Sequence, residues 1–144
     1  MDKAIPKERL RSCGLKATPR RLAIAGYLES CGCARTAEDV HSRLRPRLGR
    51  LGLQTVYRVL EELADAGLLA RVDRPDKVRS YAACRAEGKR HHHHIVCTGC
   101  GRVEVVECEF PAEQRRRIER STGFRVSDHQ MQVEGLCPDC RRER

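Results

Sequence analysis

The sequence predicts an α+β protein, and two patterns along the chain carry this prediction. Residues 18–82 hold three segments of helical periodicity followed by two short runs of strand character. Residues 91–144 hold strand-like runs and a helix bracketed by two Cys-x-x-Cys pairs, a pattern typical of a small α/β module clasped by metal. Each part is short of core on its own. We therefore expect two small units, residues 1–83 and 91–144, joined by a hinge at 84–90.

The charge divides between these units in a similar way. The chain has a formal charge of +9, and residues 1–80 carry 17 Lys and Arg against 10 Asp and Glu. Residues 81–144 carry 12 against 10, although most of the cysteines lie there. A basic unit beside a nearly neutral, cysteine-rich unit indicates one nucleic-acid-facing module and one control module.

The cysteines also indicate a compartment. Nine cysteines would suggest disulfides in a secreted chain, but the start, Met-Asp-Lys-Ala-Ile-Pro, contains no apolar signal region. No run approaches the roughly 18 apolar residues of a membrane helix. We therefore expect a cytoplasmic protein with no membrane partner, in which clustered cysteines are metal ligands.

The first two helices are predicted from their capping residues. Thr18 is an N-cap and Pro19 takes the first helical position of a segment whose apolar residues recur at mostly helical spacing over 20–29. Thr36 starts a second helix with acidic residues in its first turn and with Val40 facing inward.

The third helix, residues 54–66, follows Gly52 and stops at Gly67. Its apolar stripe consists of Val56, Val59, Leu60 and Leu63. Its opposite side carries Gln54, Tyr57, Arg58, Glu61 and Glu62. Two strands, residues 68–72 and 78–82, follow with a turn at 74–77. Three helices and a hairpin in this order predict a winged helix-turn-helix, whose last helix enters the major groove of DNA.

The exposed first turn of the third helix carries side chains that can read double-stranded DNA. Gln54 can read an adenine edge, Thr55 offers a hydroxyl, and Tyr57 can pack on a thymine methyl. Arg58 can hold phosphate or guanine. An ordinary amphipathic helix is the alternative, but an exposed tyrosine beside an arginine argues against it.

The second unit alternates strands with one helix. Strand-like runs over 91–97 and 102–106 lie either side of Cys97-Thr-Gly-Cys100. A helix starts at Pro111 and stops at Gly123. Residues 124–134 then alternate like a strand and lead into Cys137-Pro-Asp-Cys140.

These residues predict more than one metal site. Two cysteine pairs supply four thiolates, the number that a closed tetrahedral zinc site needs, so we predict a structural Zn²⁺. The ligands are Cys97, Cys100, Cys137 and Cys140. The four histidines at 91–94 alternate between two faces of their strand. Cys84 can reach one of these faces, and His129 can reach the other.

Together these residues resemble the ferric uptake regulator (Fur) family of metal-dependent repressors, over nearly the whole chain. The motifs are Gly14-Leu-Lys-Ala-Thr-Pro-Arg-Arg, Thr36-Ala-Glu-Asp, Thr55-Val-Tyr-Arg-Val-Leu, Asp65-Ala-Gly, the histidine run and both cysteine pairs. The resemblance implies a homodimer in which two winged helices bind a palindromic operator and residues 91–144 form the dimerisation domain. It implies base contacts from Tyr57, phosphate contacts from Arg58, and a minor-groove contact from Lys16, with Arg20 in the same motif.

The chain departs from iron- and peroxide-sensing members at three ligand positions, where it has Ala34, Ala82 and Val105. Tyr81-Ala-Ala-Cys84 is instead similar to zinc-sensing (Zur) members, whose regulatory site uses a cysteine with the second and fourth histidines. One thiolate with two imidazoles suits zinc, with another divalent metal as the alternative. The predicted regulatory ligands are Cys84, His92, His94 and Asp73, the last a substitute for an aspartate whose position is Ala70.

The family's additional site corresponds to the other histidine face, and its usual glutamate falls on Ala112. The predicted ligands there are His91, His93, His129 and the neighbouring Glu113. The remaining cysteines match no family ligand, and we interpret them as buried thiols: Cys13, Cys31, Cys33 and Cys108. The alternative for Cys31-Gly-Cys33 is that it binds metal or becomes oxidised.

The sequence thus predicts a metal-responsive repressor, most similar to the Zur branch, that controls zinc uptake genes. The same scaffold sensing iron, manganese, nickel or peroxide is the alternative, and a structural zinc-ribbon adaptor is a more distant one. An enzyme with a small-molecule substrate is not expected, because no His-Glu-x-x-His and no His-x-Glu beside a cysteine pair occurs.

Overall fold

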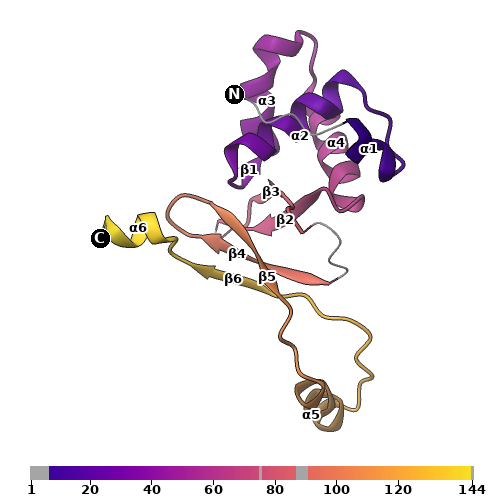
Figure 1. Ribbon diagram of the computed structural model, residues 1–144, viewed down its shortest axis with the longest axis vertical. Helices are drawn as coiled ribbons and strands as arrows, with labels where there is room; N and C mark the ends of the chain where they lie inside the picture. The colour runs from indigo at the N-terminus through magenta and orange to yellow at the C-terminus, as the bar shows by residue number, and fades with distance from the viewer. Residues whose placement is uncertain (1–6, 75, 87–90, 144) are drawn as a thin grey trace.

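The structure is a computed structural model that describes residues 7–74, 76–86 and 91–143, and the predicted α+β class is confirmed (Figure 1). The helices of the N-terminal unit are α1 (Lys7–Ser12), α2 (Pro19–Cys31), α3 (Ala37–Leu48) and α4 (Leu53–Asp65). Its strands are β1 (Arg35–Thr36), β2 (Leu69–Asp73) and β3 (Arg79–Ala83). The C-terminal unit contains β4 (His92–Cys97), β5 (Val103–Glu107), α5 (Ala112–Thr122), β6 (Gln132–Gly135) and α6 (Pro138–Arg142).

The capping predictions for α2 and α3 are confirmed. The Thr18 hydroxyl accepts a hydrogen bond from the Arg21 backbone N–H at 3.3 Å, and Pro19 is the first helical residue. At α3 the Asp39 N–H donates to the Thr36 hydroxyl at 3.1 Å, and the Asp39 carboxylate accepts from the Thr36 N–H at 3.0 Å. This reciprocal capping box satisfies two backbone donors that the helix start would otherwise leave unpaired.

The core of the N-terminal unit lies between α2, α3, α4 and the hairpin. The apolar stripe predicted for α4 is buried, and it packs with Ile24 and Leu28 of α2 and with Val40 and Leu44 of α3. The helix ends at Asp65, one residue before the predicted last residue Ala66, and Gly67 beyond it has a φ of +75°. Tyr81 of β3 is 1% exposed, and its hydroxyl donates to Glu61 on α4. The helix α4, which is the predicted recognition helix, and the β2–β3 hairpin, which we call the wing, therefore share one packed interior.

The hairpin forms as predicted, with β3 between β1 and β2. Its register pairs Ala70 with Ala82 and Asp73 with Arg79. The predicted turn at 74–77 includes Pro75, and the predicted hinge at 84–90 includes residues 87–90, which lie outside the described residues. The helix α1 and the two-residue strand β1 were not predicted, because elements this short carry too few residues to show a period.

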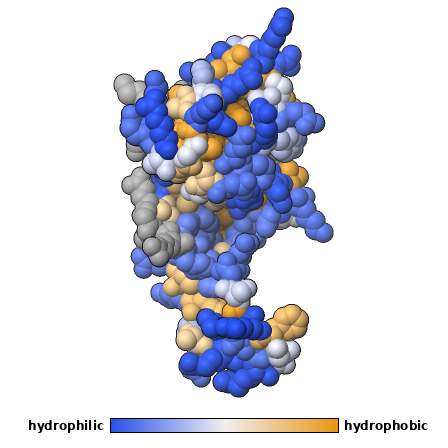
Figure 2. Space-filling view, turned by 90° about the vertical axis from the view of Figure 1, so that its right-hand side faces the viewer, coloured by the Kyte–Doolittle hydropathy of each residue, from blue (hydrophilic) through white to orange (hydrophobic). Residues whose placement is uncertain are grey.

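In the second sheet, β4 lies between antiparallel β5 and parallel β6. The strand predicted over 124–134 is wrong for residues 124–131, because the ladder with β4 begins only at Gln132, opposite His94. Residues 108–131 instead form an arm that carries α5 away from the sheet (Figure 1). No residue of α5 is buried, and Phe124 beyond it is 76% exposed. Figure 2 shows this lobe standing clear of the rest of the molecule with apolar atoms on its surface.

The two units are docked by an apolar cluster and by backbone contacts. Ala34, Val72 and Ala82 of the N-terminal unit are buried together with Val96 of β4. The Ala34 N–H donates to the Gly101 carbonyl at 2.8 Å. The Gln132 amide bonds both the N–H and the carbonyl of Asp73, at 3.0 and 2.6 Å. The sheet that carries the histidines is thus fastened directly to the wing.

The capping box leads to a stability prediction. Thr36→Ala removes the hydroxyl that accepts from the Asp39 N–H, while the backbone N–H of residue 36 can still donate to the Asp39 carboxylate. The loss of the hydroxyl should lower the free energy of unfolding by about 1 kcal/mol. The measurement is urea denaturation at saturating zinc, followed by circular dichroism. Thr36→Ser retains the hydroxyl and should unfold near the wild-type midpoint; equal losses in both variants would contradict the capping role.

Candidate metal centres and nucleic-acid interface

The four cysteines of the two Cys-x-x-Cys pairs converge at one end of the second sheet. Their sulfurs all lie within 4.8 Å of one another, and Cys100 Sγ is 3.8 Å from Cys137 Sγ. A tetrahedron with Zn–S bonds of about 2.3 Å has S···S edges of about 3.8 Å. The Cys137 N–H, with those of Cys100 and Gly99, points at Cys97 Sγ and lowers the pKa of that thiol to about 6. The backbone donors favour the thiolate form of Cys97, and the four sulfurs have the spacing of a closed zinc centre.

Gly99 allows the two cysteine pairs to come this close. A Cβ at this position would lie 2.9 Å from Cys140 Sγ and 3.2 Å from Cys140 Cβ, which is closer than van der Waals contact permits. The sequence spacing Cys97-Thr-Gly-Cys100 indicated a metal knuckle, but the reason for glycine at its third position is a contact with a residue 41 positions away.

A second cluster joins the end of the wing to the first histidine face. The ligand atoms of Cys84, His92 and His94 lie within 4.8 Å of one another, with Cys84 Sγ 3.2 Å from His92 Nε2. Burial lowers the pKa of His94 to about 4, so its ring is neutral near pH 7. Its Nε2 is buried with no hydrogen-bond partner, which is costly unless the lone pair binds a cation. The donor set and the unpartnered nitrogen both fit zinc.

Asp73 is not brought into this cluster, contrary to the sequence-based prediction. Asp73 is exposed at the last position of β2, and its backbone N–H and carbonyl are hydrogen-bonded to the Gln132 amide. The cluster therefore contains three protein ligands among the described residues.

The other histidine face forms a third cluster, with a membership that differs from the prediction. His91, His93 and His129 converge as expected, but the fourth member is Cys108 rather than Glu113. Glu113 lies on α5, which projects away from the sheet. The register of the β4–β5 pair would have identified Cys108. His92 pairs with residue 107, so residue 108 falls opposite His91.

The buried-thiol interpretation of the remaining cysteines is also corrected at two positions. Cys13 is exposed, and Cys108 belongs to the third cluster. Cys31 and Cys33 are half-buried, and the Cys33 N–H donates to Cys31 Sγ at 3.4 Å.

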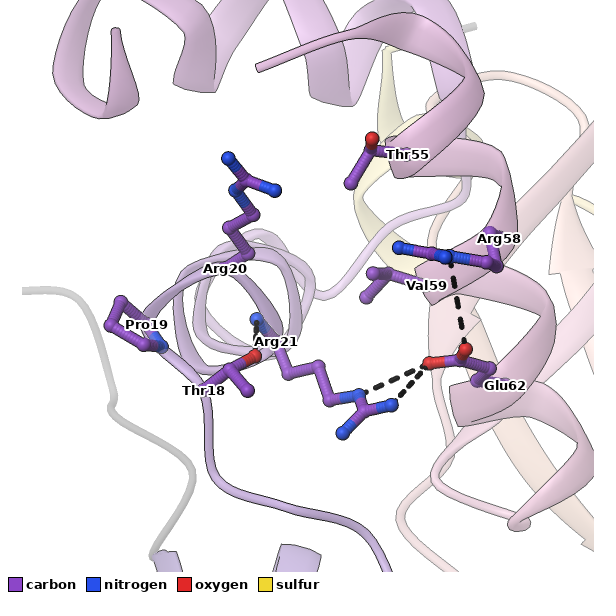
Figure 3. A pocket seen from close by; sticks show the side chains of 8 residues that line it. All are labelled: Thr18, Pro19, Arg20, Arg21, Thr55, Arg58, Val59 and Glu62. Atoms are coloured by element: carbon purple, nitrogen blue, oxygen red, sulfur yellow. Dashed lines mark hydrogen bonds and ion pairs between the residues drawn. The ribbon is translucent and has the colours of Figure 1, made fainter. Parts of the chain in front are cut away.

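Most of the predicted DNA-contacting residues lie around the start of α4. Arg20, Thr55 and Arg58 line a groove between α2 and α4, and the Arg58 side chain extends across it toward α2 (Figure 3). Gln54 and Tyr57 are exposed on α4, and the Tyr57 hydroxyl donates to Glu38 on α3 at 2.8 Å.

An ion pair that holds α2 against α4 beside this groove was not predicted from the sequence. Arg21 of α2 donates twice to one carboxylate oxygen of Glu62 on α4, at 2.7 and 3.1 Å (Figure 3). It also donates to the carbonyl of Lys16, whose side chain is exposed in the loop before α2. Arg58 Nε is 3.9 Å from Glu62, and its side chain is 71% exposed. Arg58 therefore keeps donors available for phosphate, whereas Arg21 is occupied in packing α2 against α4.

Comparisons with known proteins give one family. A model described as "Ferric uptake regulator family" matches residues 12–134. The chain is 35% identical over 136 residues to the ferric uptake regulation protein of Bacillus subtilis (strain 168), covering 93% of this chain and 91% of that protein. It is 30% identical to the peroxide-responsive repressor PerR of Staphylococcus epidermidis, over 93% of this chain and 87% of that protein.

Solved structures agree at the level of fold. A ferric uptake regulator from Francisella tularensis with iron matches with a TM-score of 0.60 and 28% identity, over 89% of this chain and 96% of that one. A zinc uptake regulator complexed with zinc and DNA matches with a TM-score of 0.74 and 22% identity, over 94% of this chain and 90% of that one. None of the helices in the described part of the chain is long and apolar enough to cross a membrane.

Gly99 offers a test of the four-cysteine centre. Gly99→Ala forces Cys140 to shift, which should cost about 1–3 kcal/mol and accelerate zinc release from this centre roughly tenfold or more. The measurement is the slowest phase of zinc transfer to a chromogenic chelator. Gly135→Ala is the control, since its Cβ would make an ordinary 3.9 Å contact with Ile95. Identical release from both variants would contradict the close-approach role.

Proposed function

The chain belongs to the ferric uptake regulator family, and from this premise we propose that it is a zinc-responsive repressor of zinc uptake genes that acts in the cytoplasm. Family membership makes it a metal-responsive transcription regulator, not an enzyme, that binds DNA as a dimer. This also overrides the alternative of a structural zinc-ribbon adaptor. The choice of zinc and of its target genes is the proposal.

The cluster of Cys84, His92 and His94 is the observation that carries the zinc assignment. One thiolate and two neutral imidazoles are soft and borderline donors, which favour zinc over iron or manganese. Three protein ligands hold an ion less firmly than a closed four-cysteine centre does. An ion at this cluster is therefore expected to exchange with free zinc, while the four-cysteine centre retains its own.

The rival proposal is the same scaffold with iron, manganese, nickel or peroxide as effector, and the identities to the Bacillus and Staphylococcus relatives favour it. The side chains at the three positions where this chain lacks the ligands of iron- and peroxide-sensing members favour zinc instead. Ala34 and Ala82 are buried with Val72 and Val96, in an apolar cluster that offers no ligand atom. Val105 pairs with His94 across the β4–β5 ladder and likewise offers none. Metal content after anaerobic purification separates the two proposals.

The position of the cluster suggests how metal controls DNA binding. Cys84 follows the last wing strand, and both histidines lie on β4, so the three ligands span the hinge. A bound zinc would tie the wing to β4. Because it needs all three side chains together, it favours the docked arrangement of the two units by its differential affinity. Docking then sets the distance between the two α4 helices of a dimer on a palindromic operator.

Metal dependence of operator binding tests this assignment. Cys84→Ala and His94→Ala should each shift the half-maximal free zinc for operator binding upward by at least tenfold, because each removes one of three ligands. The measurement is fluorescence anisotropy of operator DNA in zinc buffers. Cys13→Ala removes an exposed cysteine outside the clusters and should respond like wild type. Wild-type zinc dependence in both cluster variants would refute the proposed sensor.

The DNA interface gives a second, independent prediction. Arg58→Ala should weaken binding and reduce the slope of log affinity against log salt by about 1, as expected for the loss of one phosphate contact. The measurement is operator affinity between low and physiological salt at saturating zinc. Arg116→Ala removes an equal charge from the exposed surface of α5 and should leave that slope unchanged. If both variants change the slope equally, Arg58 contributes only to the general charge.

A further inference from the structure

The third cluster contains an arrangement that hydrogen bonding does not explain. His129 Nε2 lies 3.1 Å from His91 Nε2, 3.1 Å from His93 Nε2 and 3.2 Å from Cys108 Sγ. An imidazole nitrogen carries either one proton or one lone pair, so it can form one good hydrogen bond in the ring plane. Three donors or acceptors around the same nitrogen therefore require another cause, and a shared cation is the simplest one.

The distances agree with a tetrahedral metal site. All four ligand atoms lie within 4.8 Å of one another. Zn–N bonds of about 2.0–2.1 Å place two nitrogens of a tetrahedron about 3.4 Å apart, and a nitrogen and a sulfur about 3.6 Å apart. The observed separations are shorter by a few tenths of an ångström, so the four side chains need only a small outward adjustment to bind one ion.

The neighbouring residues hold the ligands in place. The Phe110 ring stacks on His129 with centroids 4.2 Å apart and an interplanar angle of 23°. The Asp128 carboxylate accepts a hydrogen bond from the backbone N–H of His129 at 2.8 Å, and it lies 3.9 Å from the ring nitrogen Nδ1 of His91. His93 is 3% exposed. Supporting contacts of this kind orient the first ligands of metal centres.

We infer that Cys108 is the fourth ligand of this cluster, and that the cluster is a closed, thiolate-containing site for a thiophilic divalent cation, Zn²⁺, that fixes the arm formed by residues 108–131. A carboxylate ligand such as Glu113 would leave a harder site suited to iron or manganese. The thiolate favours zinc and, with four protein ligands, leaves no open position for water or substrate.

The ligands come from both ends of the arm. Cys108 follows β5 and His129 precedes β6, while the remaining two histidines belong to the β4 segment. An ion held by all four closes the arm into a loop across the sheet, which restricts the chain as a cross-link does. Because α5 has no buried residue, its position relative to the sheet depends on this closure. The exposed apolar residues of the arm, Ile118, Phe124 and Met131, are then presented in one orientation.

Protection of individual thiols from alkylation tests the inference. The full-length protein is treated with iodoacetamide with and without Zn²⁺, and labelling of each cysteine is read from peptide masses. We expect zinc to slow labelling of Cys108 at least tenfold in wild type and in Cys84→Ala, which removes the proposed sensor. His93→Ala should abolish that protection. Zinc content should fall by one ion per chain in Cys108→Ser and remain unchanged in Glu113→Ala.

The same digest shows whether each variant is folded, because Cys97 stays protected while the four-cysteine centre is intact. Equal labelling of Cys108 with and without zinc, in a protein whose Cys97 remains protected, would overturn the inference. Loss of one zinc in Glu113→Ala but not in Cys108→Ser would overturn it as well. Because the Cys84→Ala background retains the third cluster, these outcomes are independent of whether the protein senses zinc.

Discussion

The alternation of side chains along β4 is the constraint on which the three metal clusters depend. In a strand, successive side chains point to opposite faces, so four consecutive histidines cannot all bind one ion. One pair faces the wing and meets Cys84, and the other faces the arm and meets His129. Cys97, at the end of the same strand, belongs to the four-cysteine centre. A shift of one residue in the register of β4 would therefore exchange the two histidine pairs and disrupt all three clusters.

β4 can influence DNA binding because it is fastened to the wing and through it to the recognition helix. The apolar contact of Val96 with Val72 and Ala82 excludes water from the junction. The Gln132 amide extends the hydrogen bonding of β2 into the second sheet. From the wing, Tyr81 reaches Glu61 on α4. These contacts form a continuous route of packed residues from the metal clusters to α4, through which we propose that a bound metal favours the docked arrangement of the two units.

The molecule combines one well-packed unit with one that has little apolar core of its own. The helices around α4 bury the large apolar side chains, whereas α5 and α6 contain no buried residue. Only 3% of residues are aromatic, so the second unit has few large side chains with which to build a core. We expect metal ligation and the partner subunit of the dimer to supply the constraints that an apolar core supplies in the first unit.

The sequence by itself determined the features that follow local rules. Capping residues marked the starts of α2 and α3, apolar spacing marked the buried face of α4, and two Cys-x-x-Cys pairs marked the thiolate centre. Strand alternation divided the four histidines into the two pairs that the structure shows. Each of these patterns is complete within a few neighbouring residues, because caps, periods and knuckles depend on local backbone geometry.

The tertiary structure decided which distant side chains complete each cluster. Cys108 joins the histidines because the β4–β5 register places it opposite His91, while Glu113 is carried away on α5. Asp73 lines the same pocket as His92 and His94, but its carboxylate is not among the ligand atoms that lie within 4.8 Å of one another in the Cys84 cluster. Residues 124–131 have strand-like alternation but no neighbouring strand to pair with in the described sheet. Partners of this kind depend on register and docking between segments far apart in the chain, which local patterns do not encode.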